Sequence, residues 1–123
     1  MNNNRKILVI DDSQTMYKII AKNLEANGII DADYAPDGLS GVKIARIKDY
    51  DLITMDIDMP GIDGFEAAKE ILKENSGQKI LFISARFNED NIIKAKEIGI
   101  NYFLPKPFSF ELFTTTIFEA LGS

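Results

Sequence analysis

The chain has 123 residues, 46% of them hydrophobic and 27% charged, which is typical of one globular domain, residues 1–123, and argues against disorder. The formal net charge of −5 argues against direct nucleic-acid binding, because phosphate contacts need a basic surface. The sequence contains no Cys and no His, which excludes disulfide bonds, thiol chemistry and histidine ligands for zinc.

The first predicted element is a short strand, Ile7–Ile10, which follows the polar residues MNNNRK. Four apolar residues are too few for a signal-peptide core or a membrane span, so we expect a cytoplasmic protein without a membrane segment. The strand leads directly into Asp11 and Asp12. Two adjacent carboxylates at the exit of a buried strand need a counter-charge, and the later elements indicate which one.

Apolar runs alternate with segments of helical periodicity along the rest of the chain. The predicted strands are Ile7–Ile10, Ala32–Tyr34, Leu52–Met55, Ile80–Ile83 and Tyr102–Leu104, and the predicted helices are residues 13–27, 38–49, 64–75, 88–98 and 109–121. Because each strand is followed by a helix, we expect right-handed crossover connections within a parallel sheet.

Turn and capping residues support these boundaries. A left-handed residue is favoured just past a helix end, and the candidates are Gly28, Gly77 and Gly99. Asp63, followed three residues later by Glu66, has the spacing of a capping box. The stretch MPGI at residues 59–62 places Pro and Gly at the centre of a type II turn.

The pattern predicts an α/β fold: a flavodoxin-like doubly wound domain with a five-stranded parallel sheet, strand order 2-1-3-4-5 and helices on both faces. The first, third and fourth strands are continuously apolar, as expected of strands covered on both faces. The second contains Asp33 and the fifth runs into Pro105, and both are easier to accommodate at a sheet edge. Ligands bind such sheets at the carboxyl ends of the strands, where the winding reverses.

Polar side chains follow four of the predicted strands at this edge. They are Asp11 and Asp12, Asp56 and Asp58, Ser84, and Lys106. Two carboxylates about 4 Å apart repel by roughly 4 kcal/mol at an effective dielectric constant of 20, so such a cluster needs a bound cation or partial protonation. A ligand set made only of oxygen atoms favours Mg²⁺, and Mn²⁺ would suit the same ligands.

Asp56 is the natural nucleophile of this cluster. A carboxylate beside a divalent cation can attack a phosphoryl group and carry it as an acyl phosphate. The protein then mainly positions groups and neutralises charge on the phosphoryl oxygens, a task suited to the cation, Lys106 and the Ser84 hydroxyl. An anionic nucleophile needs no general base, so the absence of His is no obstacle.

Four stretches at these separations, ILVIDD, LITMDIDMPGIDG, ILFISA and YFLPKPF, closely resemble the receiver domain of two-component response regulators, of the chemotaxis-regulator kind. The resemblance covers nearly the whole chain. It implies that Asp56 accepts phosphate from the phosphohistidine of a histidine kinase or phosphotransfer protein, in a bacterial-type phosphorelay. It also implies that the protein is a signalling switch rather than an enzyme, catalysing only its own phosphorylation and dephosphorylation.

The resemblance also implies a role for each site residue. Mg²⁺ would be bound directly by Asp12, Asp56 and the backbone carbonyl of Asp58, and through water by Asp11. The phosphoryl group would contact Ser84, Lys106 and the backbone N–H groups of Met59 and Ala85, and the peptide bond between Lys106 and Pro107 would be cis. Phe103 would turn inward as Ser84 shifts toward phosphate, and Ser84 and Phe103 together would form the switch.

Phosphorylation would then bias an equilibrium between two arrangements of residues 88–98, 102–104 and 109–121, the face that contacts an unknown output protein or effector domain. The last helix has a core stripe of Phe110, Phe113, Ile117 and Leu121, and Leu112 and Phe118 lie off it, so they are candidates for the partner surface. The chain ends soon after this helix, which fits either a free-standing receiver or a piece of a longer regulator.

Two residues depart from the commonest receiver pattern. Asp58 adds an acid two residues after Asp56, and Arg86 adds a cation two residues after Ser84. Side chains at these positions stand where an attacking water would approach. We therefore hypothesise that Asp58 and Arg86 pair across the mouth of the site and set the phosphate lifetime.

Three other interpretations compete with a receiver. The spacing of Asp56 and Asp58 resembles the nucleophile motif of haloacid-dehalogenase-type phosphatases, although Pro60 stands where that motif has Thr or Val. A calcium loop starting at Asp56 fails, because Pro60 offers no side-chain ligand and Ala67 replaces the required Glu. A docking module that never turns over phosphate would keep all the carboxylates, and only chemistry separates it from a receiver.

Overall fold

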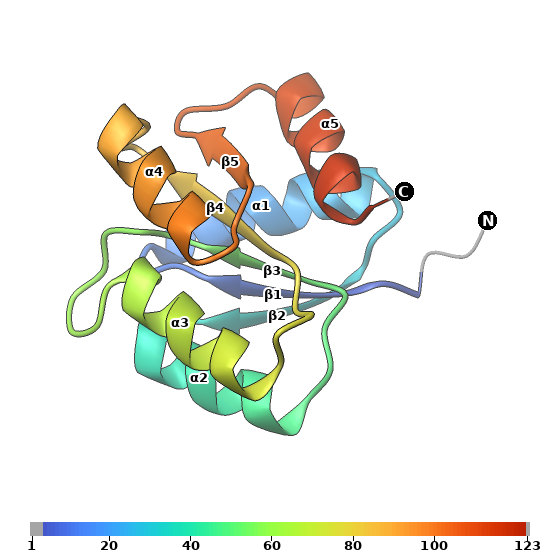
Figure 1. The fold of residues 1–123 in the computed structure, drawn as a ribbon. Helices are drawn as coiled ribbons and strands as arrows, with labels where there is room; N and C mark the ends of the chain where they lie inside the picture. Colours follow the sequence, from blue (N-terminus) through green and yellow to red (C-terminus); the bar gives the residue numbers. More distant parts are fainter. Residues whose placement is uncertain (1–3, 123) are drawn as a thin grey trace.

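A computed structural model describes residues 4–122, in which five strands and five helices alternate along the chain (Figure 1). The strands are β1 (Lys6–Ile10), β2 (Asp31–Ala35), β3 (Leu52–Met55), β4 (Ile80–Ser84) and β5 (Tyr102–Pro105). The helices are α1 (Gln14–Ala26), α2 (Gly38–Ile47), α3 (Gly64–Glu74), α4 (Glu89–Glu97) and α5 (Phe110–Ala120). None of these five helices combines the length and the apolar character that a membrane-spanning helix requires.

All five strands are parallel, and their order in the sheet is β2-β1-β3-β4-β5, which confirms the predicted topology. Every residue of β3 and β4 is buried, and so is every residue of β1 after Lys6. Most residues of β2 and β5 are partly exposed, as expected of edge strands. The apolar character of the three central runs therefore predicts their position correctly.

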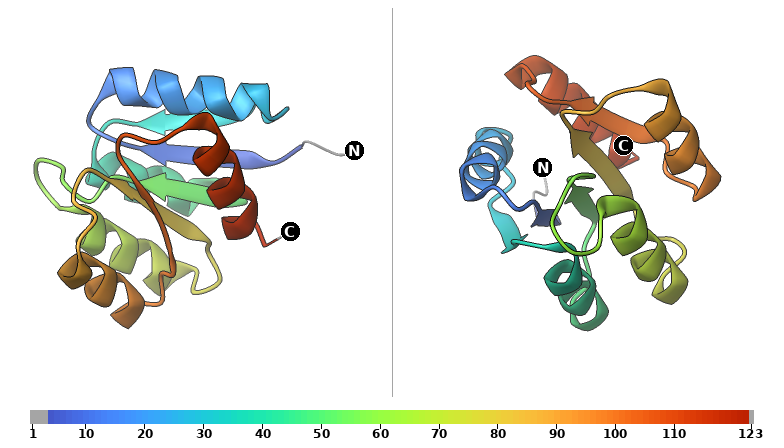
Figure 2. Two further views of the ribbon diagram at one scale, coloured as in Figure 1. Left: turned by 90° about the horizontal axis from the view of Figure 1, so that it is seen from above. Right: turned by 90° about the vertical axis from the view of Figure 1, so that its left-hand side faces the viewer.

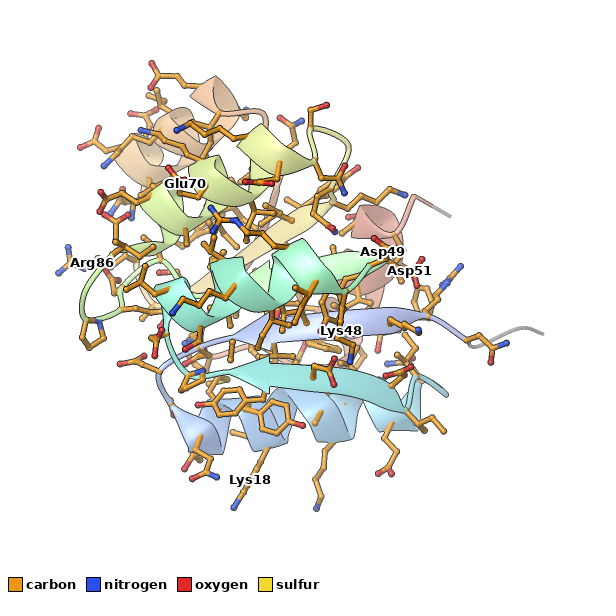
Figure 3. All side chains as sticks on the ribbon, turned by 90° about the horizontal axis from the view of Figure 1, so that it is seen from below. Lys18, Lys48, Asp49, Asp51, Glu70 and Arg86 are labelled. Atoms are coloured by element: carbon orange, nitrogen blue, oxygen red, sulfur yellow. The ribbon has the colours of Figure 1, made fainter. Side chains whose placement is uncertain are left out.

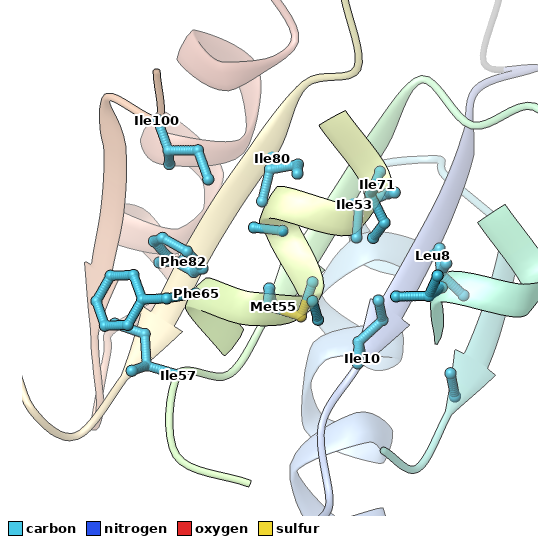
Figure 4. Packing of buried hydrophobic residues seen from close by; sticks show 14 of the residues in the cluster. Leu8, Ile10, Ile53, Met55, Ile57, Phe65, Ile71, Ile80, Phe82 and Ile100 are labelled. Atoms are coloured by element: carbon cyan, nitrogen blue, oxygen red, sulfur yellow. The ribbon is translucent and has the colours of Figure 1, made fainter. Parts of the chain in front are cut away.

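Helices cover both faces of the sheet (Figure 2). On one face, α1 and α5 pack on alternate strand residues such as Val9 and Leu81. On the other face, α2, α3 and α4 cover the remaining strand residues, with Met55 and Phe82 among the buried residues that Figure 4 labels. The alternation of side chains along each strand thus divides the core into two layers.

A side-chain oxygen caps the first turn of every helix. The capping residues are Ser13, Asp37, Asp63, Asn88 and Ser109, and each accepts a hydrogen bond from the backbone N–H three residues later. The predicted cap at Asp63 is among them, with 2.9 Å from the Glu66 nitrogen to Asp63 Oδ1. Each cap thus satisfies one backbone N–H of the first turn that has no partner within the helix.

The glycine predictions are right at two positions and wrong at one. Gly28 and Gly99 have positive φ angles, and Gly61 has a φ of 82° in the predicted turn. Gly77 has no positive φ. There the Asn75 side chain ends α3 instead, because its Oδ1 accepts a hydrogen bond from the Gly77 N–H at 3.2 Å.

One helix boundary and one core residue differ from the sequence prediction for physical reasons. Helix α2 ends at Ile47, before the predicted Asp49, because Lys48 leaves the helix in extended conformation and binds Asp33 on β2 at 2.7 Å. In α5, Phe113 and Ile117 are buried as predicted, but Phe110 is 44% exposed. Phe110 is the first residue of α5 and lies at the end of the helix rather than over the sheet.

Candidate phosphoacceptor and metal site

The functional side chains lie at the carboxyl edge of the sheet. Asp11 and Asp56 directly follow β1 and β3, Ser84 is the last residue of β4, and Lys106 directly follows β5. Since the strands are parallel, their carboxyl ends open onto the same edge. The structure therefore brings together residues that are up to 95 positions apart in the sequence.

The sheet hydrogen bonds continue one residue beyond the strands and fix the backbone of the site. The N–H of Asp11 donates to Ala35 at 3.1 Å, and the N–H of Asp56 donates to Ile10 at 2.9 Å. The N–H of Lys106 donates to the Ser84 carbonyl at 2.9 Å. A hydrogen bond to a neighbouring strand thus positions each of these residues. The peptide bond between Lys106 and Pro107 is cis.

A glycine lets α3 approach the backbone of the candidate phosphoacceptor. A Cβ atom at Gly64 would lie 2.4 Å from the Asp56 carbonyl oxygen and 2.7 Å from the Ile57 Cα. The Gly64 N–H also donates to the Ile57 carbonyl at 2.8 Å. Any larger residue would push the start of α3 away from Asp56.

Three carboxylates form the acidic cluster: Asp11, Asp12 and Asp56 each offer one oxygen, and these oxygens all lie within 4.8 Å of one another. Asp11 and Asp56 are buried, whereas Asp12 is exposed. The cluster therefore has one exposed member, Asp12, through which an ion from water can reach it.

Lys106 supplies the positive charge of the cluster. Its Nζ atom lies 2.9 Å from Asp11 Oδ2 and 3.7 Å from Asp56 Oδ2, and its side chain is 15% exposed. The second oxygen of Asp11 accepts a hydrogen bond from the Ser13 N–H at 2.8 Å. Lys106 thus binds Asp11 most closely and leaves Asp56 less fully neutralised.

The environment of Asp56 disfavours its ionised form. Burial raises the pKa of its carboxyl to about 6, and the charges of Asp11 and Asp12 add to this rise. Lys106 and a 3.3 Å hydrogen bond from the Asp58 N–H oppose it without overcoming it. One ammonium therefore does not balance three carboxylates, and a divalent cation would. The donor set is oxygen only, so the residues fit a hard ion such as Mg²⁺.

Ser84 is the last residue of β4, at the same edge of the sheet as the acids, and only 3% of it is exposed. Its Oγ accepts a hydrogen bond from the Arg86 N–H at 3.0 Å, which leaves the hydroxyl proton free to be donated. Ala85 follows Ser84, and Met59 stands three residues after Asp56. Both lie on loops that begin at the same edge of the sheet.

Asp58 and Arg86 connect these two loops. The Nε of Arg86 lies 3.5 Å from Asp58 Oδ2, and the two side chains are 71% and 49% exposed. Figure 3 shows Arg86 at the surface beyond the strand ends. The Asp58 N–H donates to Asp56 Oδ1 and the Arg86 N–H donates to Ser84 Oγ, so the ion pair connects the two loops that follow the reactive groups. The contact proposed from the sequence is present, and its effect on phosphate stays a prediction.

Phe103 lies on β5 between two other aromatic rings. Its centroid is 5.9 Å from that of Phe82 in the core and 6.0 Å from that of Phe87, which is 51% exposed. Half-buried Phe103 therefore connects the interior to the loop after Ser84. Whether it turns inward stays a prediction.

Sequence reasoning missed two aromatic residues near the site. Phe87 was not expected to pack on Phe103, although its position three residues after Ser84 is a signal that could have suggested it. Tyr34 stacks on Tyr17 with ring centroids 4.4 Å apart. Burial raises the pKa of Tyr34, and so do Asp11 and Asp12, which puts its hydroxyl within electrostatic reach of the acids. Tyr34 pairs with Val9 in the sheet, and Val9 lies two residues before Asp11. This pairing was the signal that could have placed Tyr34 near the acids.

The two candidates for a partner surface on α5 have different environments. Leu112 is 44% exposed, in agreement with its position off the core stripe. Phe118 is partly buried against the α1–α5 core layer, and the Arg5 guanidinium lies 5.6 Å from its ring centroid. Leu112 therefore remains a candidate contact residue, whereas Phe118 already has intramolecular partners.

Comparison with known proteins gives one consistent family. Residues 7–118 match the response regulator receiver domain. Chemotaxis protein CheY-3 of Vibrio cholerae is 33% identical over 111 residues, which cover 89% of this chain and 85% of that protein. Chemotaxis protein CheY of Treponema pallidum is 38% identical over 104 residues, 83% of this chain and 72% of that protein.

A solved structure agrees with these relatives. The structure of chemotaxis protein CheY4 of Vibrio cholerae superposes with a TM-score of 0.88 at 25% sequence identity, covering 95% of this chain and 98% of that one. These similarities support a receiver and do not support the phosphatase or docking-module interpretation.

Proposed function

Because the chain belongs to the response regulator receiver domain family, we propose that it is a signalling switch in which Asp56 takes up and releases a phosphoryl group. The observation that carries the proposal is the convergence of Asp56, the other two acids and Lys106 at one edge of the sheet. Family membership makes the chain a signalling protein rather than a classical enzyme. Catalysis of its own phosphorylation and dephosphorylation belongs to the proposal.

Receiver domains bind Mg²⁺ through acidic residues, and the acidic cluster has the composition for it. Here we propose that Asp12, Asp56 and the backbone carbonyl of Asp58 hold the ion directly and that Asp11 does so through water. When bound, the ion would neutralise charge on the phosphoryl oxygens and on the carboxylates. Lys106 would keep Asp11 in place through its 2.9 Å contact.

The proposed transfer uses the Asp56 carboxylate as the nucleophile. One carboxylate oxygen forms a bond to phosphorus, and the P–N bond of a donor phosphohistidine breaks. The departing imidazole nitrogen keeps the electron pair and takes a proton from solvent. Since the carboxylate is already anionic above its pKa of about 6, the step needs no general base from the chain.

The other site residues would bind the transferred group. Lys106 lies 3.7 Å from Asp56 Oδ2, close enough for its ammonium to reach an oxygen on the phosphorylated side chain. The Ser84 hydroxyl has a proton to donate, and the backbone N–H groups of Met59 and Ala85 would take the remaining oxygen positions. Every charge that phosphate adds would then have a donor nearby.

Ser84 and Phe103 would couple phosphorylation to a conformational change outside the site. A shift of Ser84 toward phosphate would open space on the β5 side, and Phe103, held between Phe82 and Phe87, would follow. The face formed by α4, β5 and α5 would carry the signal to an output protein or effector domain. Apolar side chains exposed in this part of the molecule are Phe87, Ile93, Phe110 and Leu112.

We also propose that the ion pair between Asp58 and Arg86 limits the access of water to the acyl phosphate. The two side chains stand on the loops that flank Asp56 and Ser84, and they lie 3.5 Å apart. A closed pair would cover the direction from which water attacks, and an open pair would expose it.

Phosphorylation by a small-molecule donor tests the proposal. The chain is incubated with acetyl phosphate and Mg²⁺, and its intact mass is measured over time. We expect a gain of one phosphoryl group, abolished by chelation of the metal and by Asp56→Asn, while Asp49→Asn, an exposed acid outside the site, behaves as the parent. An unlabelled chain would contradict the proposal, and hydrolysis of many unrelated phosphomonoesters would indicate a phosphatase.

A further inference from the structure

A groove of about 410 Å³ lies between α2 and α3, separate from the acidic cluster. This volume is within the range of protein ligand sites. Its apolar part comes from Leu39 and Val42 on α2 and from Ile62 on the loop before α3. Its charged rim consists of Lys43, Arg46, Glu66, Lys69 and Glu70.

The apolar part is both exposed and firmly held. Leu39 is 58% exposed, although it is a large apolar side chain. Ile62 packs so closely on α2 that a Cβ atom added to Gly38 would lie 2.7 Å from Ile62 Cγ1. The groove is therefore preformed, and it leaves apolar surface in water that a partner could cover.

Some of the rim charges are already neutralised by neighbours. Arg46 pairs with Glu74 at 3.3 Å, and Glu70, which Figure 3 labels on α3, pairs with Lys73 at 3.4 Å. Both pairs are partly exposed and add little stability. They do, however, remove one cation and one anion from those available to a ligand.

The rim charges without an ion pair are mostly positive. Among residues 4–122, Lys43, Lys69 and Glu66 have no oppositely charged group within 4.0 Å. Glu66 lies in the first turn of α3, where the helix dipole favours a negative charge. The two ammonium groups come from opposite walls of the groove, Lys43 from α2 and Lys69 from α3.

We propose that this groove docks an acidic amphipathic helix of a partner protein. A helix can lay an apolar stripe into a groove between two other helices, and carboxylates beside that stripe would meet Lys43 and Lys69. The walls are helices of 10 and 11 residues, so a partner helix of about three turns matches their length. The surface differs from the α4–β5–α5 face and goes beyond the phosphorylation switch.

Binding is tested on the full isotope-labelled chain with a stapled helical peptide of about 12 residues that carries a Leu stripe flanked by Glu. A peptide with the same stripe flanked by Lys is the charge control. We expect the acidic peptide to shift the backbone NMR signals of α2, α3 and Ile62. The double variant Lys43→Glu/Lys69→Glu should weaken binding about tenfold or more, and Leu39→Asp should abolish it.

Matched variants separate this proposal from others. Lys18→Glu/Lys22→Glu makes the same change in net charge, but on α1, and should leave the affinity for the acidic peptide unchanged. Asp56→Asn should also bind as the parent does, so failure of phosphorylation and failure of docking are distinguishable. Equal binding of the Lys-flanked peptide, shifts outside the groove, or no binding of the acidic peptide would each overturn the proposal.

Discussion

The Lys106 ammonium lies 2.9 Å from Asp11 Oδ2, although β5 and β1 are separated in the sheet by β3 and β4. The contact crosses the carboxyl edge and passes close to Asp56, whose Oδ2 is 3.7 Å from the same nitrogen. One cation therefore serves two buried carboxylates. Burial, with the charges of Asp11 and Asp12, raises the pKa of Asp56 although Lys106 opposes this rise, and the site is therefore receptive to a metal ion.

The first prediction concerns the stability cost of ionised Asp56. Its pKa is about 6 in the folded protein and 3.8 in the unfolded chain, so the folded state binds more protons between these values. Stability therefore falls as the pH rises through this window, by about 3 kcal/mol at most, and the cost is complete above about pH 6. Without Mg²⁺, Asp56→Asn should be more stable than the parent at neutral pH.

Urea denaturation at several pH values measures this difference. We expect Asp56→Asn to gain about 2 kcal/mol near pH 7, with the gain disappearing near pH 4 and shrinking when Mg²⁺ is added. Asp49→Asn should show no such dependence. A variant less stable than the parent at neutral pH would mean that Lys106 compensates the Asp56 charge fully.

The sequence predicts the composition of this site better than its internal contacts. Asp11, Asp56, Ser84 and Lys106 follow from the strand ends of a parallel sheet, because topology alone brings those ends together. The partner chosen by Lys106 depends instead on side-chain rotamers and on burial, which an apolar pattern does not contain. The same holds for the contact of Phe87 with Phe103.

Helix ends show a similar limit. Gly77 follows α3 at the position where glycine often ends a helix, yet the Asn75 side chain does so. Lys48 continues the helical pattern of α2, yet it leaves the helix to pair with Asp33. In both cases a side-chain contact competes with a local preference, and the contact is invisible until the fold is known.

The second prediction concerns the close approach of α3 to Asp56. Gly64→Ala places a Cβ atom against backbone atoms of Asp56 and Ile57, which cannot move aside as a flexible side chain can. We expect a loss of about 1–3 kcal/mol of stability and slower labelling by acetyl phosphate. Gly77→Ala is the control, because its nearest neighbour would be 3.7 Å away. Urea denaturation and intact mass measure both effects, and equal behaviour of the two variants would contradict the prediction.

The third prediction concerns an unpaired hydroxyl in the core. Thr54 on β3 is 1% exposed, and its Oγ1 has no hydrogen-bond partner among the described residues. Thr54→Val keeps the shape and removes the buried polar atom, so we expect a gain of about 1–2 kcal/mol. Thr116→Val is the control. The Thr116 hydroxyl donates to the Leu112 carbonyl at 2.8 Å, so this variant should be as stable as the parent or less stable. Destabilisation of Thr54→Val in thermal or urea unfolding would show that the hydroxyl has a bound water as its partner.

The last prediction concerns the lifetime of the acyl phosphate, and it depends on the ion pair between Asp58 and Arg86. Exposed pairs of this kind contribute about 0.2–1 kcal/mol, and a change of that size in an activation barrier alters a rate by up to about fivefold. If the closed pair shields the acyl phosphate from water, Asp58→Asn and Arg86→Ala should each lose phosphate about twofold to fivefold faster than the parent. The double variant should be no faster than the faster single variant, because either change breaks the same contact.

Decay of the phosphorylated mass after removal of the donor measures these rates. Salt provides an independent test: decay of the parent should speed up with ionic strength, because salt screens an exposed pair, while decay of the double variant should not. Glu70→Gln breaks a comparable surface pair with Lys73, away from the strand ends, and should leave the decay unchanged. Decay at the parent's rate in both single variants would show that water reaches the acyl phosphate by a path that this ion pair does not cover.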